Sequence, residues 1–226
     1  MIDLHTHTLF SDGELLPSEL LRRAEVLGLR AVALADHADM STLDHVVPRI
    51  VRACEENNRH RRIRAIPAIE LTHVPPALIG RYVGEARRLG ARIVVVHGES
   101  PVEPVEPGTN RAAIEAGADI LSHPGLIADG DARMAAERGV SLEVSARKGH
   151  SLANGHVVAV ARRTGARLVL NTDAHAPGDL IAEPFARTVA LGAGMTPAEY
   201  EELRANMARL AGWEAPPGPC GLETRD

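Results

Sequence analysis

The sequence predicts an α/β fold, a barrel of seven parallel strands in which helices connect the strands. Seven short apolar runs alternate with segments of helical periodicity, and this alternation is typical of parallel strands with right-handed crossovers. Most of the runs also end in a histidine or a carboxylate. The ends of parallel strands converge on one face of a barrel, whereas an open sheet would spread these groups along an edge, so the pattern favours closure.

The expected strands are short and built from Ala, Val, Leu and Ile, in keeping with 45% hydrophobic but only 2% aromatic residues. On the second strand, Ala31, Ala33 and Ala35 share the face of His37, so small residues would fill the interior while the larger residues between them meet the helices. In order, the runs are MIDLHTH (1–7), RAVALADH (30–37), RAIPAIEL (64–71), RIVVVHGE (92–99), ADILSHPG (118–125), VSLEVSA (140–146) and RLVLNTDAH (167–175).

The segments between the strands carry helix signals. Residues 17–28 begin with a proline, stop at a glycine and place Leu20, Leu21, Ala24 and Leu27 on one face. Such glycines are expected to cap the end of a helix just before the next strand begins. We expect this role for Gly28, Gly90, Gly117 and Gly165.

The end of the chain is expected to hold a final helix and then a tail. Thr196 as N-cap, Pro197 at the first helical position and Glu199 three residues after the cap form a capping box. The sequence that follows is rich in Pro and Gly and has no periodicity. A chain of 226 residues suits a single unit, so we expect one domain over residues 1–213 and a flexible tail over residues 214–226.

Composition narrows the classes of partner. The net charge is −5 and the one basic run is 59–62, which argues against long nucleic acid as a ligand. No apolar run approaches a membrane span, and the N-terminus shows no signal-peptide pattern. Cys54 and Cys220 lack a C-x-x-C partner and are expected to be unpaired thiols. A cytoplasmic protein is therefore expected.

Groups able to bind a metal recur at the ends of the expected strands. In DLHTHTLFSDG, His5 and His7 lie two apart, so on a strand both would project from the same face, which is good geometry for holding one ion. The set at the strand ends is His7, His37, Glu70, His97, His123, Asp173 and His175, and Glu143 lies within the sixth run. Converging at one mouth, these residues predict a metal site.

With these motifs in this order, the sequence resembles the PHP (polymerase and histidinol phosphatase) family of metallophosphoesterases. The matching segments span residues 3–175 and are DLHTHTLFSDG, LADH, AIEL, VVHGE, LSHPG and NTDAH. The resemblance implies a distorted TIM-like (β/α)7 barrel with its site at the C-terminal ends of the strands. It also implies up to three divalent metal ions, of zinc, manganese or iron.

The resemblance further implies which residues hold each ion. Nine residues would share the three ions: His5, His7, Glu70 and Asp173 the first, Glu70, His97 and His123 the second, and Asp12, His37 and His175 the third. Glu70 would bridge two ions, and Glu70 and Asp173 are also expected catalytic residues. Such a cluster carries a formal charge of about +3, which matches a phosphate monoester dianion together with a hydroxide formed from bound water.

The loop after the sixth run offers candidate substrate contacts. Arg147 and Lys148 are expected to bind the substrate phosphate, and Lys148 is the only lysine in the chain. His150 is a candidate general acid for the leaving alkoxide. Glu143 either orients a metal ligand or pairs with a neighbouring cation, and the sequence leaves both open.

Other titratable residues near the motifs receive lesser roles. Asp36 should point out of the barrel by strand alternation, so helix capping is expected of it. Glu99 lies two residues after His97 and is a weak candidate for a place beside the cluster. The remaining histidines in polar segments are expected to lie outside the site, namely His45, His60 and His73.

The function expected from these features is hydrolysis of a small phosphate monoester, histidinol phosphate or a similar metabolite, by a metal-bound hydroxide. One alternative is a PHP-type nucleotide phosphoesterase or nuclease, although such relatives often carry an inserted subdomain between the second and third strands, where this chain has only a helix. Another is an amidohydrolase, which typically has eight strands and often a bridging lysine. A non-catalytic metal-binding domain is a third, although such domains usually lose ligands. The oligomeric state stays open.

Overall fold

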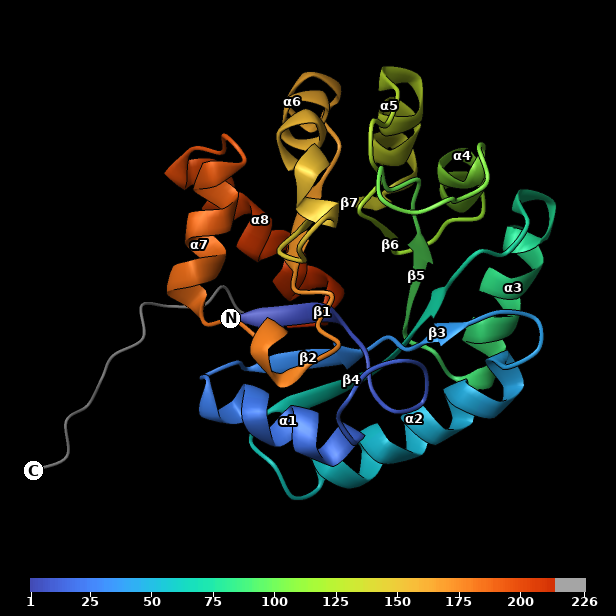
Figure 1. Cartoon of the computed structure of the whole chain (residues 1–226), viewed down its shortest axis with the longest axis vertical. Coiled ribbons are helices and arrows are strands. Elements are labelled where there is room, and N and C mark those ends of the chain that lie inside the picture. Colours follow the sequence, from blue (N-terminus) through green and yellow to red (C-terminus); the bar gives the residue numbers. More distant parts are fainter. Residues whose placement is uncertain (214–226) are drawn as a thin grey trace, which may run out of the picture.

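Parallel strands form a sheet that nearly closes into a barrel, in the order β1-β2-β4-β5-β6-β7-β8 (Figure 1). The computed structural model describes residues 1–213. The strands are β1 (Ile2–Thr6), β2 (Ala31–Leu34), β3 (His37–Ala38), β4 (Arg64–Leu71), β5 (Ile93–His97), β6 (Ile120–Ser122), β7 (Ser141–Ser145) and β8 (Leu168–Asn171). All but β3 lie within the seven apolar runs, and β3 begins at the last residue of the second run, so the predicted distorted (β/α)7 barrel is confirmed.

The second run differs in detail, because it forms two strands rather than one. β2 pairs with β1 and β4, whereas the two-residue β3 pairs only with β4. Between them, the amide of Ala35 donates to the carbonyl oxygen of Thr6, and the carbonyl oxygen of Asp36 accepts from the amide of Glu70.

The first and last strands meet and bring the barrel close to closure. Thr6 and Ala174 form a parallel bridge. The amide of His7 donates to Ala174 O at 2.8 Å, and the amide of Asp173 donates to His5 O at 3.0 Å. The histidines of β1 are thereby placed next to the aspartate that follows β8.

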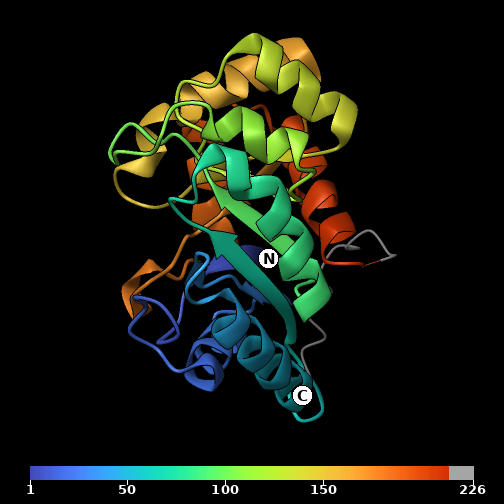
Figure 2. The ribbon, with the colours of Figure 1, turned by 90° about the vertical axis from the view of Figure 1, so that its right-hand side faces the viewer.

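Helices cover the outside of the strands (Figures 1 and 2). They are α1 (Pro17–Val26), α2 (Leu43–Asn58), α3 (Pro76–Leu89), α4 (Thr109–Glu115), α5 (Asp129–Arg138), α6 (Asn154–Thr164), α7 (Glu183–Gly192) and α8 (Pro197–Leu210). α8 packs against β8 and β1, the two strands at the seam. It begins with the expected capping box, in which the Glu199 amide donates to Thr196 Oγ1 at 3.2 Å and Glu199 Oε2 accepts from the Thr196 amide at 2.7 Å.

The core divides along the strand alternation that the sequence predicts. Ala31, Ala33 and Ala35 belong to an inner cluster with residues of other strands, while Val32 and Leu34 pack with the surrounding helices. The expected C-cap glycines all have positive φ, from 70° to 107°. One detail of the first helix is wrong, because α1 ends at Val26 and leaves the side chain of Leu27 40% exposed rather than on the buried face.

Residues 214–226, for which a flexible tail is expected, lie outside the described part of the chain, as does Cys220. Cys54 is buried on α2. No helix among residues 1–213 combines the length and the apolar character needed to cross a bilayer.

Candidate metal centre

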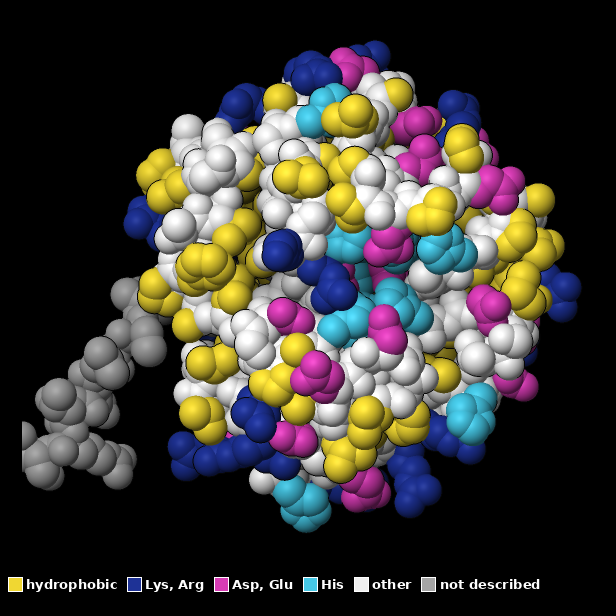
Figure 3. Space-filling model, in the orientation of Figure 1, with side chains coloured by type: hydrophobic (Ala, Val, Ile, Leu, Met, Phe, Trp, Pro, Cys, Tyr) yellow, Lys and Arg dark blue, Asp and Glu magenta, His cyan; other side chains and the backbone are white. Residues whose placement is uncertain are grey.

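Histidines and carboxylates gather in a hollow at the C-terminal ends of the strands. Figure 3 looks onto this face and shows the histidine side chains in cyan, next to acidic and basic groups. Three sets within residues 1–213 have ligand atoms that lie within 4.8 Å of one another. They are His5, His7 and Asp173; His7, Asp12, His37 and His175; and His97, His123 and His150. Eight of the nine predicted ligands thus fall into these sets, and Glu70 lies among them.

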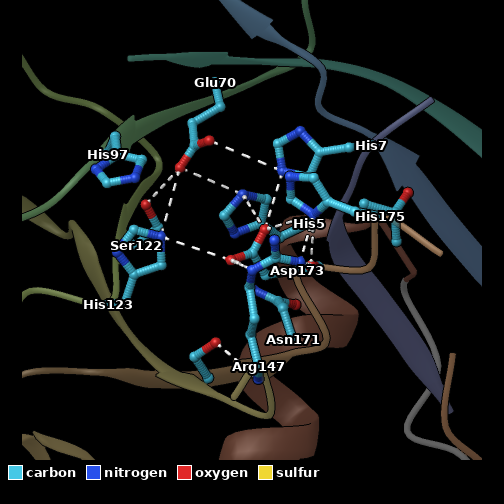
Figure 4. A network of polar contacts seen from close by, with 12 residues as sticks. His5, His7, Glu70, His97, Ser122, His123, Arg147, Asn171, Asp173 and His175 are labelled. Atoms are coloured by element: carbon cyan, nitrogen blue, oxygen red, sulfur yellow. Dashed lines mark hydrogen bonds and ion pairs between the residues drawn. The ribbon is translucent and has the colours of Figure 1, made fainter. Parts of the chain in front are cut away.

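The first set joins β1 to the segment after β8. His7 Nε2 lies 3.1 Å from Asp173 Oδ1, and His5 Nε2 lies 3.7 Å from the same oxygen. Both histidines also face Glu70, at 3.3 Å from His5 Nε2 and 3.8 Å from His7 Nε2 (Figure 4). The four residues predicted to hold the first ion are therefore brought together.

The second set lies nearer the rim and contains the predicted third site. Asp12 Oδ1 is 3.2 Å from His175 Nε2 and 3.5 Å from His37 Nε2. The two imidazole nitrogens are 3.4 Å apart. His7 lies within ligand distance of this set as well, so it stands between two of the groups.

The third set contains His150, for which the sequence predicts only the role of a general acid. His150 stacks on His123 with ring centroids 3.9 Å apart, and His97 lies beside both. Glu70, predicted to complete this site, has Oε1 at 3.8 Å from His123 Nε2. Burial lowers the pKa of His150, so the ring favours the neutral form that can bind a metal.

Glu70 lies at the centre of the three sets. Its side chain is fully buried, and it contacts a histidine of each set, including His37 Nδ1 at 2.7 Å. Ser122 also donates to Glu70 Oε1 at 2.7 Å. Although burial alone would raise the pKa of Glu70, the histidines around it hold the pKa well below its usual range. This central position is what a bridging carboxylate requires.

The chemistry of the buried atoms fits divalent metal ions. Within residues 1–213, His5 Nε2, both ring nitrogens of His7 and His123 Nδ1 are buried without a hydrogen-bond partner. Burial lowers the pKa of His7 to about 3 and that of His123 well below its usual value, so both rings favour the uncharged state. Unpaired buried nitrogens are costly unless something satisfies them, and neutral imidazoles beside carboxylates are ligands suited to zinc, manganese or iron.

Glu143 contacts His5 at Nδ1, the ring nitrogen that does not face Glu70 and Asp173. Its Oε2 accepts from His5 Nδ1 at 2.8 Å and from Asn171 Nδ2 at 2.9 Å. A neutral His5 that donates through Nδ1 keeps the lone pair of Nε2, which faces Glu70 and Asp173. Burial would lower the pKa of His5, but the three carboxylates around it raise the pKa well above its usual value. Of the two roles left open for Glu143, the contacts support that of orienting a ligand.

The two predicted phosphate-binding residues lie in different surroundings. Arg147 reaches the rim of the centre, with Nη1 2.9 Å from the carbonyl oxygen of Asp173 and Nε 3.6 Å from Asp173 Oδ2. Lys148 is exposed and makes no hydrogen bond or ion pair with the other residues of the described chain. Only Arg147 is therefore held next to the predicted ligands.

Two lesser roles predicted from the sequence are wrong, that of Asp36 as a helix cap and that of Glu99 as a neighbour of the cluster. Asp36 caps no helix; it is buried and accepts from the amide and hydroxyl of Thr8 at 2.7 and 2.8 Å and from Ser11 Oγ at 2.9 Å. Its carboxylate thus holds the loop that carries Asp12. Glu99 lies away from the three sets, because its Oε1 accepts from the amides of Gly108 and Asn110 at the start of α4.

Two residues at the mouth, Glu103 and His73, are not among those predicted from the sequence. Glu103 lies 3.1 Å from His97 Nε2, 3.3 Å from His150 Nε2 and 3.6 Å from His73 Nε2. His73, expected outside the site, could have been suspected from its place just after β4. A hydrogen bond from His97, aided by the nearby histidines, lowers the pKa of Glu103 to about 2. No pattern marks Glu103, since it lies in a proline-rich loop.

Backbone strain is concentrated at the same face. Three residues other than glycine have positive φ among residues 1–213: His73 at 52°, His123 at 26° and Asp173 at 52°. Side chains rarely adopt this conformation, and it persists where surrounding contacts enforce it, often at functional sites. Here it occurs at two predicted ligands and at a residue beside them.

The barrel and its ligand sets define the class of metal-dependent hydrolases that act at the C-terminal ends of barrel strands. Residues 3–146 match the PHP domain, and the chain belongs to this family. The chain is also 48% identical over 201 residues to the uncharacterized protein MJ1295 of Methanocaldococcus jannaschii, covering 88% of this chain and 92% of that protein.

Several solved structures share the fold. A chain of archaeal ribonuclease P with mature tRNA has a TM-score of 0.71 at 16% identity, covering 94% of this chain and 90% of that one. An amidohydrolase has a TM-score of 0.62 at 15% identity over 95% and 74% of the two chains. A candidate histidinol phosphatase, HisK of Listeria monocytogenes, has a TM-score of 0.54 at 11% identity over 80% and 97%. At these identities the likeness shows the fold alone.

Proposed function

We propose that the protein hydrolyses a small phosphate monoester with the help of up to three divalent metal ions. The observation that carries the proposal is the central position of Glu70 among three sets of ligands in one buried hollow. Three ion sites around one shared carboxylate suit a phosphoryl group, whose several oxygens need positive charge from more than one side.

The first task of the chain's own residues is to hold the ions. His5, His7, Glu70 and Asp173 would bind the first, Glu70, His97 and His123 the second, and Asp12, His37 and His175 the third. Divalent ions in such a site act as Lewis acids and lower the pKa of bound water. Glu143 keeps the His5 ring turned with Nε2 toward the centre.

The second task is to hold the substrate. Arg147 is the guanidinium at the rim, and its planar fork is suited to two phosphoryl oxygens. His150 is poorly suited to act as a general acid. Burial lowers the pKa of its ring and so disfavours the protonated form that an acid needs. Lys148 is exposed next to Arg147 in the same loop and remains a second candidate for contact with the phosphate.

Two features favour a small substrate: the net negative charge of the chain, and the absence of an inserted subdomain between β2 and β4 in the described residues. The net charge is −5, and the segment between these strands holds only β3 and helix α2. Histidinol phosphate is the first substrate to test. Nucleotide phosphodiesters and amides represent the nuclease and amidohydrolase alternatives.

The test is a screen of the metal-loaded protein against several dozen monoesters, diesters and amides. We expect phosphate release from at least one monoester, dependent on zinc, manganese or iron and abolished by chelation. Turnover of diesters or amides with no monoester hydrolysis would overturn the proposal. Glu106→Gln, a change of an exposed residue near the mouth, serves as the matched control for variants of the buried carboxylates.

A further inference from the structure

The loop between β5 and α4, residues 98–108, is fixed at both ends over the mouth of the barrel. A Cβ on Gly98 would clash with the carbonyl oxygen of Ser122, so only glycine allows this close approach. Farther along, the side chain of Glu99 accepts from the amides of Gly108 and Asn110, and Asn110 Oδ1 accepts from the amide of Glu99. The loop therefore presents its middle residues to the mouth in a defined position.

Glu103 is the residue of this loop whose carboxylate faces the histidines. Its Oε2 lies 3.1 Å from His97 Nε2, and its Oε1 lies 3.3 Å from His150 Nε2. Two donor atoms bound to one tetrahedral zinc ion at about 2.0–2.1 Å stand roughly 3.3 Å apart. Each ring nitrogen thus lies at a distance from one oxygen of Glu103 that two ligands of the same ion can have. Among residues 1–213, the ion-pair partners of Glu103 are all histidines, with no lysine or arginine among them.

The orientation of the two imidazole rings also indicates a cation between them and Glu103. His97 Nδ1 lies 3.2 Å from the carbonyl oxygen of Gly98, and His150 Nδ1 lies 2.6 Å from Ser100 Oγ. A carbonyl only accepts, so a neutral His97 donates through Nδ1 and turns the lone pair of Nε2 toward Glu103. A lone pair that faces a carboxylate is repulsive unless a cation lies between them. The cation is either a proton on the ring or a metal ion shared by both groups.

We propose that Glu103 and His150 complete the coordination of the ion held by His97 and His123. The inference rests on the metal dependence in the proposed function, and it assigns a donor from outside the strand ends to one of the sites. Three imidazoles and one carboxylate would then surround this ion, with Glu70 beside them. His97, His123 and His150 are already close enough to share an ion, and Glu103 supplies the charged fourth group.

The test measures metal affinity in the absence of substrate. Zn²⁺ is titrated by calorimetry into the full-length protein, stripped of metal, as wild type, Glu103→Gln and the control Glu106→Gln. Glu106 lies in the same loop and is exposed. We expect Glu103→Gln to lower the affinity for one equivalent of zinc by at least about tenfold to a hundredfold. Loss of a residue that only hydrogen-bonds to a metal ligand already lowers metal affinity by that much. The other equivalents and Glu106→Gln should behave as wild type.

A second readout separates a ligand from a simple ion pair. In the cobalt-loaded protein, loss of a carboxylate donor should change the visible absorption of Co²⁺, whereas loss of a neighbour that only pairs with a protonated ring should not. Zinc affinities and cobalt spectra of Glu103→Gln that match those of Glu106→Gln would overturn the inference. Phosphate release is assayed separately: wild-type protein that loads metal through Glu103 yet hydrolyses no monoester would contradict the proposed function and leave the ligand assignment standing.

Discussion

At the scale of single residues, Glu70 is the side chain that links the three sets of metal ligands. It is fully buried on β4, and its two oxygens reach His5, His37 and His123, which come from three separate elements. A carboxylate in such a position is costly to bury unless positive charge surrounds it. Metal ions held by these sets, as proposed above, would supply that charge, and the negative charge of Glu70 would in turn help to retain them.

Changing Glu70 to Gln keeps the shape of the side chain but removes its charge. We expect turnover to fall on the order of a thousandfold, about 4 kcal/mol of barrier, because a central electrostatic element is lost. Circular dichroism, metal content and kcat are measured on the same sample. A folded Glu70→Gln protein with near-wild-type kcat would contradict the bridging role.

Arg147 lies at the rim, where a substrate phosphate would arrive. Arg147→Ala should lower kcat/KM roughly ten- to a hundredfold, because one charged hydrogen bond to the substrate, of about 1.5–3 kcal/mol, is lost. The metal content should stay unchanged. Lys148→Ala is the neighbouring comparison, and its exposure leads us to expect a smaller effect. Equal kcat/KM for wild type and Arg147→Ala would remove the arginine from the site.

At the scale of elements, a buried carboxylate from the segment between β2 and β3 holds the loop that follows β1. Asp36 accepts three hydrogen bonds from Thr8 and Ser11, and Asp12 follows directly in this loop. The ligand and the carboxylate that fixes its loop thus come from different parts of the chain. The position of Asp12 in the second set therefore depends on two parts of the chain together.

Replacing Asp36 by Asn puts an amide group where only acceptors fit, so the loop should lose its fixed position. We expect the protein to retain fewer metal equivalents, with the loss matching that of Asp12→Ala. Elemental analysis after dialysis measures this loss. Asp44→Asn, an exposed change on α2, should keep the wild-type content. If Asp36→Asn kept that content as well, the loop would not need this carboxylate.

The capping box of α8 is a local device that serves the seam between β8 and β1. Thr196→Ala removes the side-chain acceptor of the Glu199 amide and should cost about 1 kcal/mol of unfolding free energy. Thr188→Ala on the exposed side of α7 should stay within about 0.5 kcal/mol of wild type. Denaturant unfolding measures both, and equal losses in the two variants would contradict the capping contribution.

At the scale of the whole molecule, the barrel concentrates buried charge at one end. Asp3, Asp36, Glu70, Glu143 and Asp173 are all buried there or along the strands that lead to it. Burial raises the pKa of Asp3 to about 6, despite hydrogen bonds from Thr172. Metal ions would balance much of this charge, so folding and metal loading should be linked.

Removal of metal should therefore destabilise the protein. Each ion present at a hundred times its Kd contributes about 2.7 kcal/mol if it binds only the folded state, so chelation should lower Tm. The loaded protein should contain more than two equivalents of zinc, manganese or iron. Scanning calorimetry and elemental analysis make the check, and one equivalent or none, with an unchanged Tm, would contradict the multinuclear centre.

The sequence by itself determined the parts of this protein that depend on local chemistry. The alternation of runs, the capping box at Thr196 and the C-cap glycines are patterns within a few residues, and the structure shows them where they were expected. The gathering of His7, Glu70 and Asp173 also follows from sequence, because parallel strands of a barrel bring their C-terminal ends to one face.

Only the tertiary structure decided the contacts that depend on the paths of loops. The carboxylate of Asp36 binds Thr8 and Ser11 because the loop after β1 passes beside the segment between β2 and β3, and strand alternation does not predict that contact. Glu103 reaches His97 because the 98–108 loop is held by distant contacts, among them the approach of Gly98 to Ser122. Such contacts join residues far apart in sequence and leave no periodic signal, so the path of a loop is decided only when the chain packs.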